Sequence, residues 1–202
     1  MTTTTHTGRR AANAAWWSAI EIGARYGVQF VLTMVLARLL TPADFGLMAM
    51  VLVFTAFAAL LVEGGLGSAL VQKQATSSDD EASVFLANLG MGILLALLLW
   101  WLAPAIAGFY AQPSLLPLLR LLAWLLPLGA LATVPNALLS QRLDFRKRAG
   151  AELAASVGAG VLALWLAWRG AGVWSLAWQA IAAAVLRAAA LWGLSGWRPR
   201  GR

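Results

Sequence analysis

Long apolar segments, separated by short polar ones, run along almost the whole chain. Six of these segments approach the roughly 20 mainly apolar residues that an α-helix needs to cross a membrane. They lie at about 16–40, 45–62, 84–109, 115–139, 151–168 and 173–194. None of them alternates strictly between apolar and polar residues, as a strand of a transmembrane barrel does. The pattern therefore predicts an all-α membrane protein with six transmembrane helices, which occupy 15–196 between a tail at 1–14 and a short segment at 197–202.

Polar residues between the segments support these boundaries. The turn 41–44, with the sequence TPAD, separates the first segment from the second, and we expect Asp44 to cap the second helix. Three acidic residues at 79–81 come just before the third segment, where carboxylates favour the positive end of a helix. Both patterns are typical of helix starts, so a cation site at 79–81 is the weaker interpretation.

Composition narrows the class of protein further. Hydrophobic residues make up 61% of the chain and charged residues 11%, against about 45–50% and about 25% in a soluble domain. There is no cysteine, and His6 in the N-terminal tail is the single histidine. No phosphate-binding loop with Lys and Ser/Thr is present. We therefore expect neither an enzyme nor a metal or cofactor site, and the dispersed net charge of +7 does not indicate nucleic-acid binding.

The cationic residues predict how the bundle is oriented. If the N-terminus is cytoplasmic, ten of the 15 lysines and arginines lie in segments on that side. Three others, Arg38, Arg120 and Arg169, lie at or near the opposite side. Such an excess is the positive-inside pattern of membrane proteins. It predicts that the N- and C-termini are both cytoplasmic.

A polar stripe runs along the first segment. Glu21, Arg25, Gln29 and Thr33 follow one another at four-residue steps, so they share one face of the helix. One interpretation is a Glu21–Arg25 pair that neutralises itself inside the bundle. The other is a water-filled cavity in which Arg25 meets an anionic substrate. The continuation of the stripe through Gln29 and Thr33 favours the cavity, because polar residues within a membrane usually mark a transport pathway.

Arg187 is a second cation inside an apolar segment. It lies about eight residues from the inner end of the sixth helix, and therefore about 12 Å deep. It either extends to the cytoplasmic headgroups or faces the cavity. If Arg25 and Arg187 converge, they form a binding site for phosphate, because each guanidinium group can donate two hydrogen bonds to phosphate oxygens.

Four further residues stand out in the apolar segments. Glu63 precedes a glycine-rich stretch and is either a loop anchor or a gate. Pro127 removes a backbone donor inside the fourth segment, so we take it as the best hinge candidate. We expect Asn88 to form a hydrogen bond between helices rather than to line the cavity, and Arg120 to anchor the outer edge by extending toward headgroups.

The order of several short motifs resembles a known family. The stretch ARLLTPADFGLMAMVLVFTAFAALLVEGGLGSALVQKQ resembles the start of polysaccharide flippases of the multidrug/oligosaccharidyl-lipid/polysaccharide exporter superfamily. Its turn lies at 37–46 and its helix end at 63–72. FYAQPSLLPLLRLLA, VPNALLSQRLDFRKRAGAE and GVWSLAWQ followed by WRPR resemble later parts of the same N-terminal lobe. Glu63 stands where the family often has Asp.

The resemblance implies a function. Such proteins move undecaprenyl-pyrophosphate-linked oligosaccharides across the bacterial inner membrane, for surface polysaccharide assembly, by alternating access between two lobes. Arg25 and Gln29 match positions of the family's first-helix polar stripe. The chain matches one lobe only, so we expect a truncated half-transporter whose second lobe is supplied in trans or by a homodimer. Its expected partners are the lipid bilayer and the lipid-linked oligosaccharide.

Two alternatives stay open at this point. A cation-coupled small-molecule exporter of the same superfamily predicts an acidic residue deep in the cavity, for which Glu21 and Glu63 are the candidates. A non-transporting scaffold of glycan assembly needs no such cavity. The short outer turns argue against a glycan polymerase, which requires large extramembrane loops.

Overall fold

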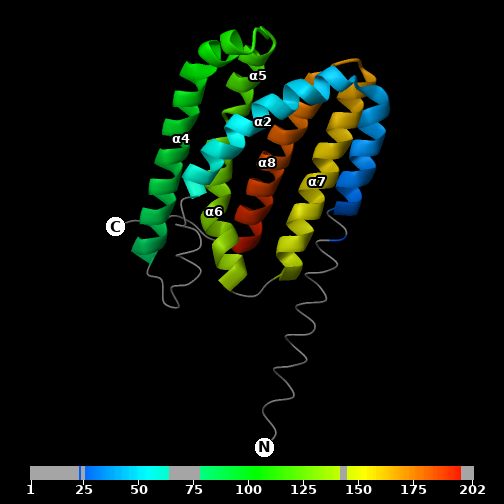
Figure 1. Cartoon of the computed structure of the whole chain (residues 1–202). Coiled ribbons are helices and arrows are strands. Elements are labelled where there is room, and N and C mark those ends of the chain that lie inside the picture. The colour runs from blue at the N-terminus through cyan, green and yellow to red at the C-terminus, as the bar shows by residue number, and fades with distance from the viewer. Residues whose placement is uncertain (1–22, 24–25, 64–77, 142–144, 197–202) are drawn as a thin grey trace, which may run out of the picture.

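The computed structural model describes residues 23, 26–63, 78–141 and 145–196, and these are helical almost throughout, with no strand. The first helix runs over Tyr26–Leu39. The helices after it are α2 (Pro42–Glu63), α4 (Ser78–Phe109), α5 (Leu115–Leu122), α6 (Leu125–Gln141), α7 (Phe145–Trp168) and α8 (Val173–Ser195). Successive long helices run up and down, and the turns before α2, α5 and α8 gather at the end drawn uppermost in Figure 1.

The helices have the length and apolarity of membrane spans. Five spans qualify within the described residues, at Pro42–Val62, Ala82–Phe109, Leu115–Ser140, Ala149–Trp168 and Val173–Ser195. The described part of the first helix is apolar but shorter, and the start predicted for it at residue 16 lies outside the described residues. Large apolar side chains such as Phe57, Trp101 and Phe109 are exposed on the outer surface, where lipid would cover them. The predicted all-α membrane bundle is confirmed.

A single carboxylate organises the upper end of the bundle. The α2 helix begins at Pro42 rather than at 45, so Thr41 is its N-cap and Asp44 its third helical residue. The backbone N–H and the hydroxyl of Thr41 donate to Asp44 Oδ2 at 2.9 and 2.7 Å, and the Asp44 N–H donates to Thr41 Oγ1 at 3.4 Å. This arrangement is a capping box. Asp44 is therefore confirmed as a capping residue, in partnership with Thr41.

The same carboxylate also reaches the start of α8. The backbone N–H of Val173 donates to Asp44 Oδ1 at 2.9 Å. Gly172, just before α8, has φ +56, and a Cβ atom added there would lie 3.2 Å from Asp44 Oδ1. Glycine is thus required both by the backbone conformation and by the close approach of Asp44.

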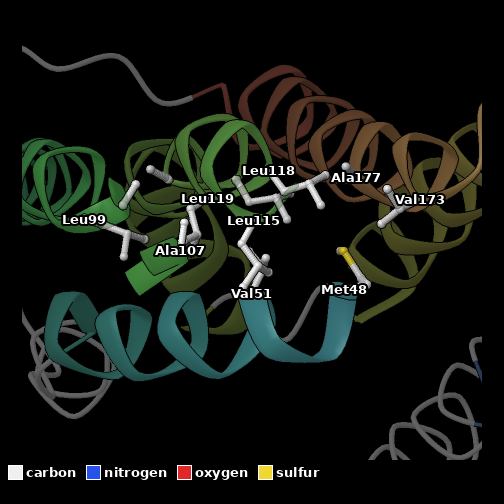
Figure 2. Close-up of a cluster of buried hydrophobic side chains, with 12 residues drawn as sticks. Met48, Val51, Leu99, Ala107, Leu115, Leu118, Leu119, Val173 and Ala177 are labelled. Atoms are coloured by element: carbon white, nitrogen blue, oxygen red, sulfur yellow. The ribbon is translucent and has the colours of Figure 1, made fainter. Parts of the chain in front are cut away.

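The largest core lies beneath this end and is built around α5. Four leucines of α5, at 115, 118, 119 and 122, follow the spacing of one helix face and are buried. They pack against Met48 and Val51 of α2, and against residues of α4 and α8, as Figure 2 shows. The short α5 helix therefore joins α2, α4 and α8 through a continuous apolar contact.

The fourth predicted helix is interrupted. One helix kinked at Pro127 was expected over about 115–139, but α5 ends at Leu122 and α6 begins at Leu125. Pro127 explains the break, because it has no N–H to donate to the carbonyl of Ala123, and its ring would clash with that carbonyl in a continuous helix. In the observed structure Pro127 lies in the first turn of α6, where the missing donor costs little. Together α5 and α6 still form one span, Leu115–Ser140.

Asn88 in α4 differs from its prediction. Its side chain is fully buried, yet neither amide atom has a hydrogen-bond partner among the described residues. The predicted hydrogen bond between helices is therefore wrong. The neighbouring apolar residues Phe85 and Leu89 pack against α6. Burial of this face of α4, rather than a contact of the amide group, therefore positions Asn88.

Candidate functional site

A cavity lies among the first helix, α7 and α8, in the half of the bundle where α7 begins and α8 ends. Its volume is about 360 Å³. We call it the α7–α8 cavity, and its lining consists of Tyr26, Gln29, Glu152, Ala155, Ser156, Ala183, Ala184 and Arg187. Polar and apolar groups thus share one cavity within membrane-spanning helices.

Small residues create the space for this cavity. Ala155 and Ser156 of α7 face Ala183 and Ala184 of α8 across the cavity, and none of the four fills it. One turn further along α7, a Cβ atom added at Gly160 would overlap the side chain of Leu32. The first helix therefore packs closely on α7 at Gly160, while the helices leave room where the cavity lies.

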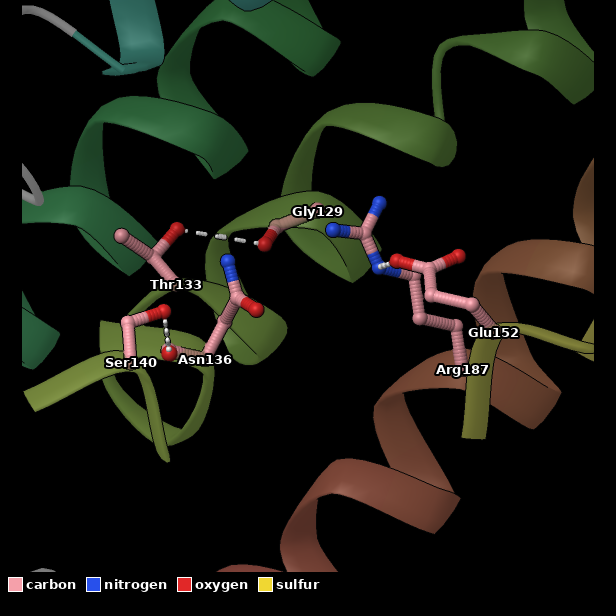
Figure 3. Close-up of polar contacts among 6 residues, drawn as sticks. All are labelled: Gly129, Thr133, Asn136, Ser140, Glu152 and Arg187. Atoms are coloured by element: carbon pink, nitrogen blue, oxygen red, sulfur yellow. Dashed lines mark hydrogen bonds and ion pairs between the residues drawn. The ribbon is translucent and has the colours of Figure 1, made fainter. Parts of the chain in front are cut away.

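An ion pair joins α7 to α8 inside the cavity. Arg187 Nε lies 2.8 Å from Glu152 Oε1, as Figure 3 shows. The distance is that of an ion pair, although the N–H is not aligned well enough to count as a hydrogen bond. The side chain of Glu152 is 7% exposed and that of Arg187 is 38% exposed. Glu152 is therefore the buried partner, and Arg187 is the one that reaches open space.

The guanidinium of Arg187 keeps unused donors. Only its Nε is engaged by Glu152, and its two Nη groups have no partner among the described residues. A guanidinium presents five N–H donors in a planar fork, and the Nη groups match the oxygens of a carboxylate or phosphate. The pair thus holds Arg187 in place while leaving donors free for an anionic group in the cavity.

The sequence predicted part of this site. Gln29 and Arg187, both named as cavity candidates, line the same cavity. Glu21 and Arg25 lie outside the described residues, so a meeting of Arg25 with Arg187 stays a prediction. Thr33 is exposed and is not part of the lining, and its hydroxyl donates to the backbone carbonyl of Gln29 at 2.8 Å.

The proposed gate and hinge lie elsewhere. Glu63 is the last residue of α2, and its side chain lies outside the described part of the chain. Pro127 is buried and borders a separate apolar cavity of about 320 Å³ between α4 and the α5–α6 break. Their roles as gate and hinge stay predictions.

Glu152 and Tyr26 line the cavity but were not among the residues predicted for it. Glu152 is the one acidic residue within the apolar segment 151–168. That position was itself a signal, because a carboxylate in a membrane span needs a cationic or polar partner. Within the described residues, no group of three or more His, Cys, Asp or Glu side chains is arranged to hold a metal ion.

Comparison with known proteins places the chain among polysaccharide biosynthesis proteins. A family model described as "Polysaccharide biosynthesis protein" matches residues 35–202. The succinoglycan biosynthesis transport protein ExoT of Rhizobium meliloti is 37% identical over 185 residues, which cover 91% of this chain and 37% of ExoT. No solved structure matches the chain with comparable significance.

Two further relatives have similar names. The lipopolysaccharide biosynthesis protein WzxC of Escherichia coli is 28% identical over 68% of this chain and 28% of its own length. The teichuronic acid biosynthesis protein TuaB of Bacillus subtilis is 28% identical over 74% of this chain and 31% of its own length. The chain thus spans about a third of the length of these relatives. With its apolar helices and these matches, it is a multi-pass protein of the bacterial inner membrane and belongs to the polysaccharide biosynthesis protein family.

Proposed function

We propose that the chain forms one lobe of a transporter that moves an undecaprenyl-pyrophosphate-linked oligosaccharide across the bacterial inner membrane. The observation that carries this proposal is the α7–α8 cavity, which Gln29 and Arg187 both line and where the Nη groups of Arg187 have no partner among the described residues. A relative that covers 91% of the chain is named a transport protein of succinoglycan biosynthesis. The proposed role is transport rather than an enzymatic reaction.

The physical requirement for such a cavity is simple. A pyrophosphate and its sugars lose their hydration in hydrocarbon, at a cost that only hydrogen-bond donors and positive charge can offset. Arg187 supplies charge-assisted donors, which form the strongest hydrogen bonds to phosphate. Gln29, Ser156 and Tyr26 supply uncharged polar groups suited to sugar hydroxyls. The polyprenyl chain would stay in lipid.

Glu152 balances the positive charge of Arg187 in the cavity. In the empty cavity it neutralises Arg187 at 2.8 Å, so no isolated cation stands in the membrane. An incoming pyrophosphate meets the two Nη groups, which Glu152 does not use. Because Glu152 is anionic, it also weakens the hold on pyrophosphate, which favours release. If both termini are cytoplasmic, as the cationic residues predict, the cavity lies in the cytoplasmic half, where such a substrate would be loaded.

A second lobe is part of this proposal. The chain covers 37% of ExoT and smaller shares of WzxC and TuaB. Alternating access requires one lobe or repeat to move against another. We therefore place the second lobe in the remaining length of a longer protein, in a partner chain or in a second copy of this chain.

One observation favours a second candidate function. A cation-coupled exporter of the same superfamily needs an acidic residue in its cavity, and Glu152 is such a residue. Its pairing with Arg187 favours the oligosaccharide transporter, because the pair has no net charge to attract a cation. Export that depends on Glu152 and on a cation gradient, but not on Arg187, would favour this alternative.

The test is a set of substitutions in cells where the unchanged chain, with its second lobe, supports surface polysaccharide. Arg187→Ala and Arg187→Lys should both lower export, the first about tenfold or more, since a charge-assisted hydrogen bond contributes about 1.5–3 kcal/mol. Arg169→Ala is the matched control, because Arg169 is exposed and lies between α7 and α8, at the other end of the bundle. Unchanged polysaccharide in Arg187→Ala, at normal protein level, would contradict the proposal.

A further inference from the structure

An apolar groove runs along the outer surface of α4, away from the α7–α8 cavity. Ile93, Ala96, Leu97 and Trp100 of α4 form one wall. They follow the i, i+3, i+4, i+7 spacing of a single helix face, so the wall is about 10 Å long. The opposite wall belongs to the α5–α6 break and consists of Ala123, Trp124 and Pro127. We call this the α4 groove, and its volume is about 320 Å³.

The helix break and two alanines explain why the groove is open. Where α5 ends and α6 begins, no continuous helix fills the space beside α4. Ala96 and Ala123 are too small to fill it. Trp100 and Trp124 leave large parts of their rings exposed at its borders. Because α4 and α5–α6 are membrane spans, this surface lies against lipid.

A cation stands at one end of the groove. The guanidinium of Arg120, in α5, lies over the ring of Trp100 with its Cζ 4.1 Å from the ring centroid. Arg120 has no carboxylate partner among the described residues, and its buried Nε has no hydrogen-bond partner there. Arg120 is thus held against an aromatic ring with no counter-ion in the described part of the chain, although a cation near hydrocarbon strongly favours an anionic partner.

We infer that the α4 groove and Arg120 form a binding site for one anionic phospholipid, with the phosphate at Arg120 and one acyl chain in the groove. The apolar lining suits an acyl chain, and the unpaired guanidinium suits a phosphodiester. Arg120 lies near the upper end of the bundle and the groove extends from it toward the membrane centre, which is how a lipid of the upper leaflet is oriented. This inference is independent of the proposed function.

A second arginine on the same protein provides a matched control. Arg169 also lies over a tryptophan ring, with its Cζ 4.3 Å from the centroid of Trp165, near the same end of the bundle. Trp165 does not border the α4 groove, whereas Trp100 does. The two arginines therefore share a contact with a tryptophan ring, and differ in whether that tryptophan borders the α4 groove.

The test is native mass spectrometry of the purified full chain, titrated with phosphatidylglycerol or with phosphatidylcholine of the same acyl chains. We expect the unchanged chain to bind one phosphatidylglycerol about tenfold more tightly than phosphatidylcholine, the size of effect that one charge-assisted contact gives. Arg120→Gln should remove this preference, and Arg169→Gln should keep it. Equal binding of the two lipids to the unchanged chain, or equal losses in the two variants, would overturn the inference.

A second pair of variants tests the groove itself. Leu97 lines the groove and is 62% exposed, so Leu97→Trp should fill the groove without disturbing the core. Leu94 is 61% exposed on the same helix but does not line the groove, so Leu94→Trp is its control. We expect tighter phosphatidylglycerol binding to be lost only in Leu97→Trp. Equal effects of Leu97→Trp and Leu94→Trp would also overturn the inference. So would binding of undecaprenyl phosphate in preference to phosphatidylglycerol.

Discussion

Asp44 and Glu152 are two carboxylates that each join a pair of helices, at opposite ends of the bundle. Both oxygens of Asp44 accept bonds at helix starts, from Thr41 and from the backbone N–H of Val173. Glu152 contacts a side chain, Arg187, whose remaining donors face a cavity. A carboxylate bound to backbone groups cannot exchange its partners without unfolding a helix end. One that faces a guanidinium beside open space can share that partner with a ligand.

The packing around the two carboxylates also differs: it is close around Asp44 and open around Glu152. Beneath Asp44, the leucines of α5 fill the space among α2, α4 and α8. Around Glu152, alanine and serine leave a cavity of about 360 Å³. The interior beneath Asp44 is therefore closely packed and fixes the helices, whereas the interior around Glu152 has room for a ligand.

The largest effect on stability is expected for Asp44→Ala. This change removes the caps of both α2 and α8, and should lower the free energy of unfolding by about 2–3 kcal/mol. Denaturant unfolding in detergent micelles measures this change. Asp44→Asn, which keeps one acceptor oxygen, should lose about half as much. An unchanged unfolding midpoint in Asp44→Ala would show that the two helix starts are held by the leucine core alone.

A somewhat smaller effect is expected for Gly172→Ala. The substitution forces a Cβ atom into a positive-φ conformation and toward Asp44 Oδ1, 3.2 Å away, at a cost of about 2 kcal/mol. Gly170→Ala is the control, since Gly170 has φ +80 but no atom within 4 Å of an added Cβ. It should cost about 1 kcal/mol. Equal costs measured in the same unfolding assay would mean that the approach of Asp44 adds nothing.

Glu152→Gln should destabilise the fold less than Asp44→Ala or Gly172→Ala, but it should change export more than they do. The buried amide keeps the shape of Glu152, and Arg187 is exposed enough to be solvated, so we expect a loss of about 1 kcal/mol in the unfolding assay. Arg187 then stands unpaired in the cavity, which should strengthen retention of a pyrophosphate substrate and slow its release. A loss of stability as large as that in Asp44→Ala, with export unchanged, would make Glu152 a structural residue like Asp44.

The smallest effect is expected for Thr33→Val. The Thr33 hydroxyl is already bonded to the carbonyl of Gln29 at 2.8 Å and does not line the α7–α8 cavity. Its loss should change the free energy of unfolding by about 0.5 kcal/mol or less and leave export unchanged. Gln29→Ala, one turn away and within the cavity, should lower export. A clear loss of export in Thr33→Val would extend the site along the first helix, as the polar stripe predicted.

Features that depend on local interactions could be predicted from the amino-acid sequence. The apolar segments specify membrane helices because a bilayer accepts only backbones whose polar groups bond within their own segment. The capping of α2 by Asp44 could be predicted because both partners lie three residues apart. The break near Pro127 also has a local cause, although the sequence indicated only a kink in a continuous helix.

Contacts between groups that are distant in the sequence depend on how the helices pack. The contact of Asp44 with Val173 joins residues 129 positions apart, and the pairing of Glu152 with Arg187 depends on how α7 packs on α8. Hydrophobic periodicity specifies that a helix buries a face, but not which neighbour covers it. For the same reason Thr33 lies outside the cavity that Gln29 lines, and Asn88 is buried without a partner among the described residues. Close packing of helices sets these distances, and packing is a property of the whole bundle.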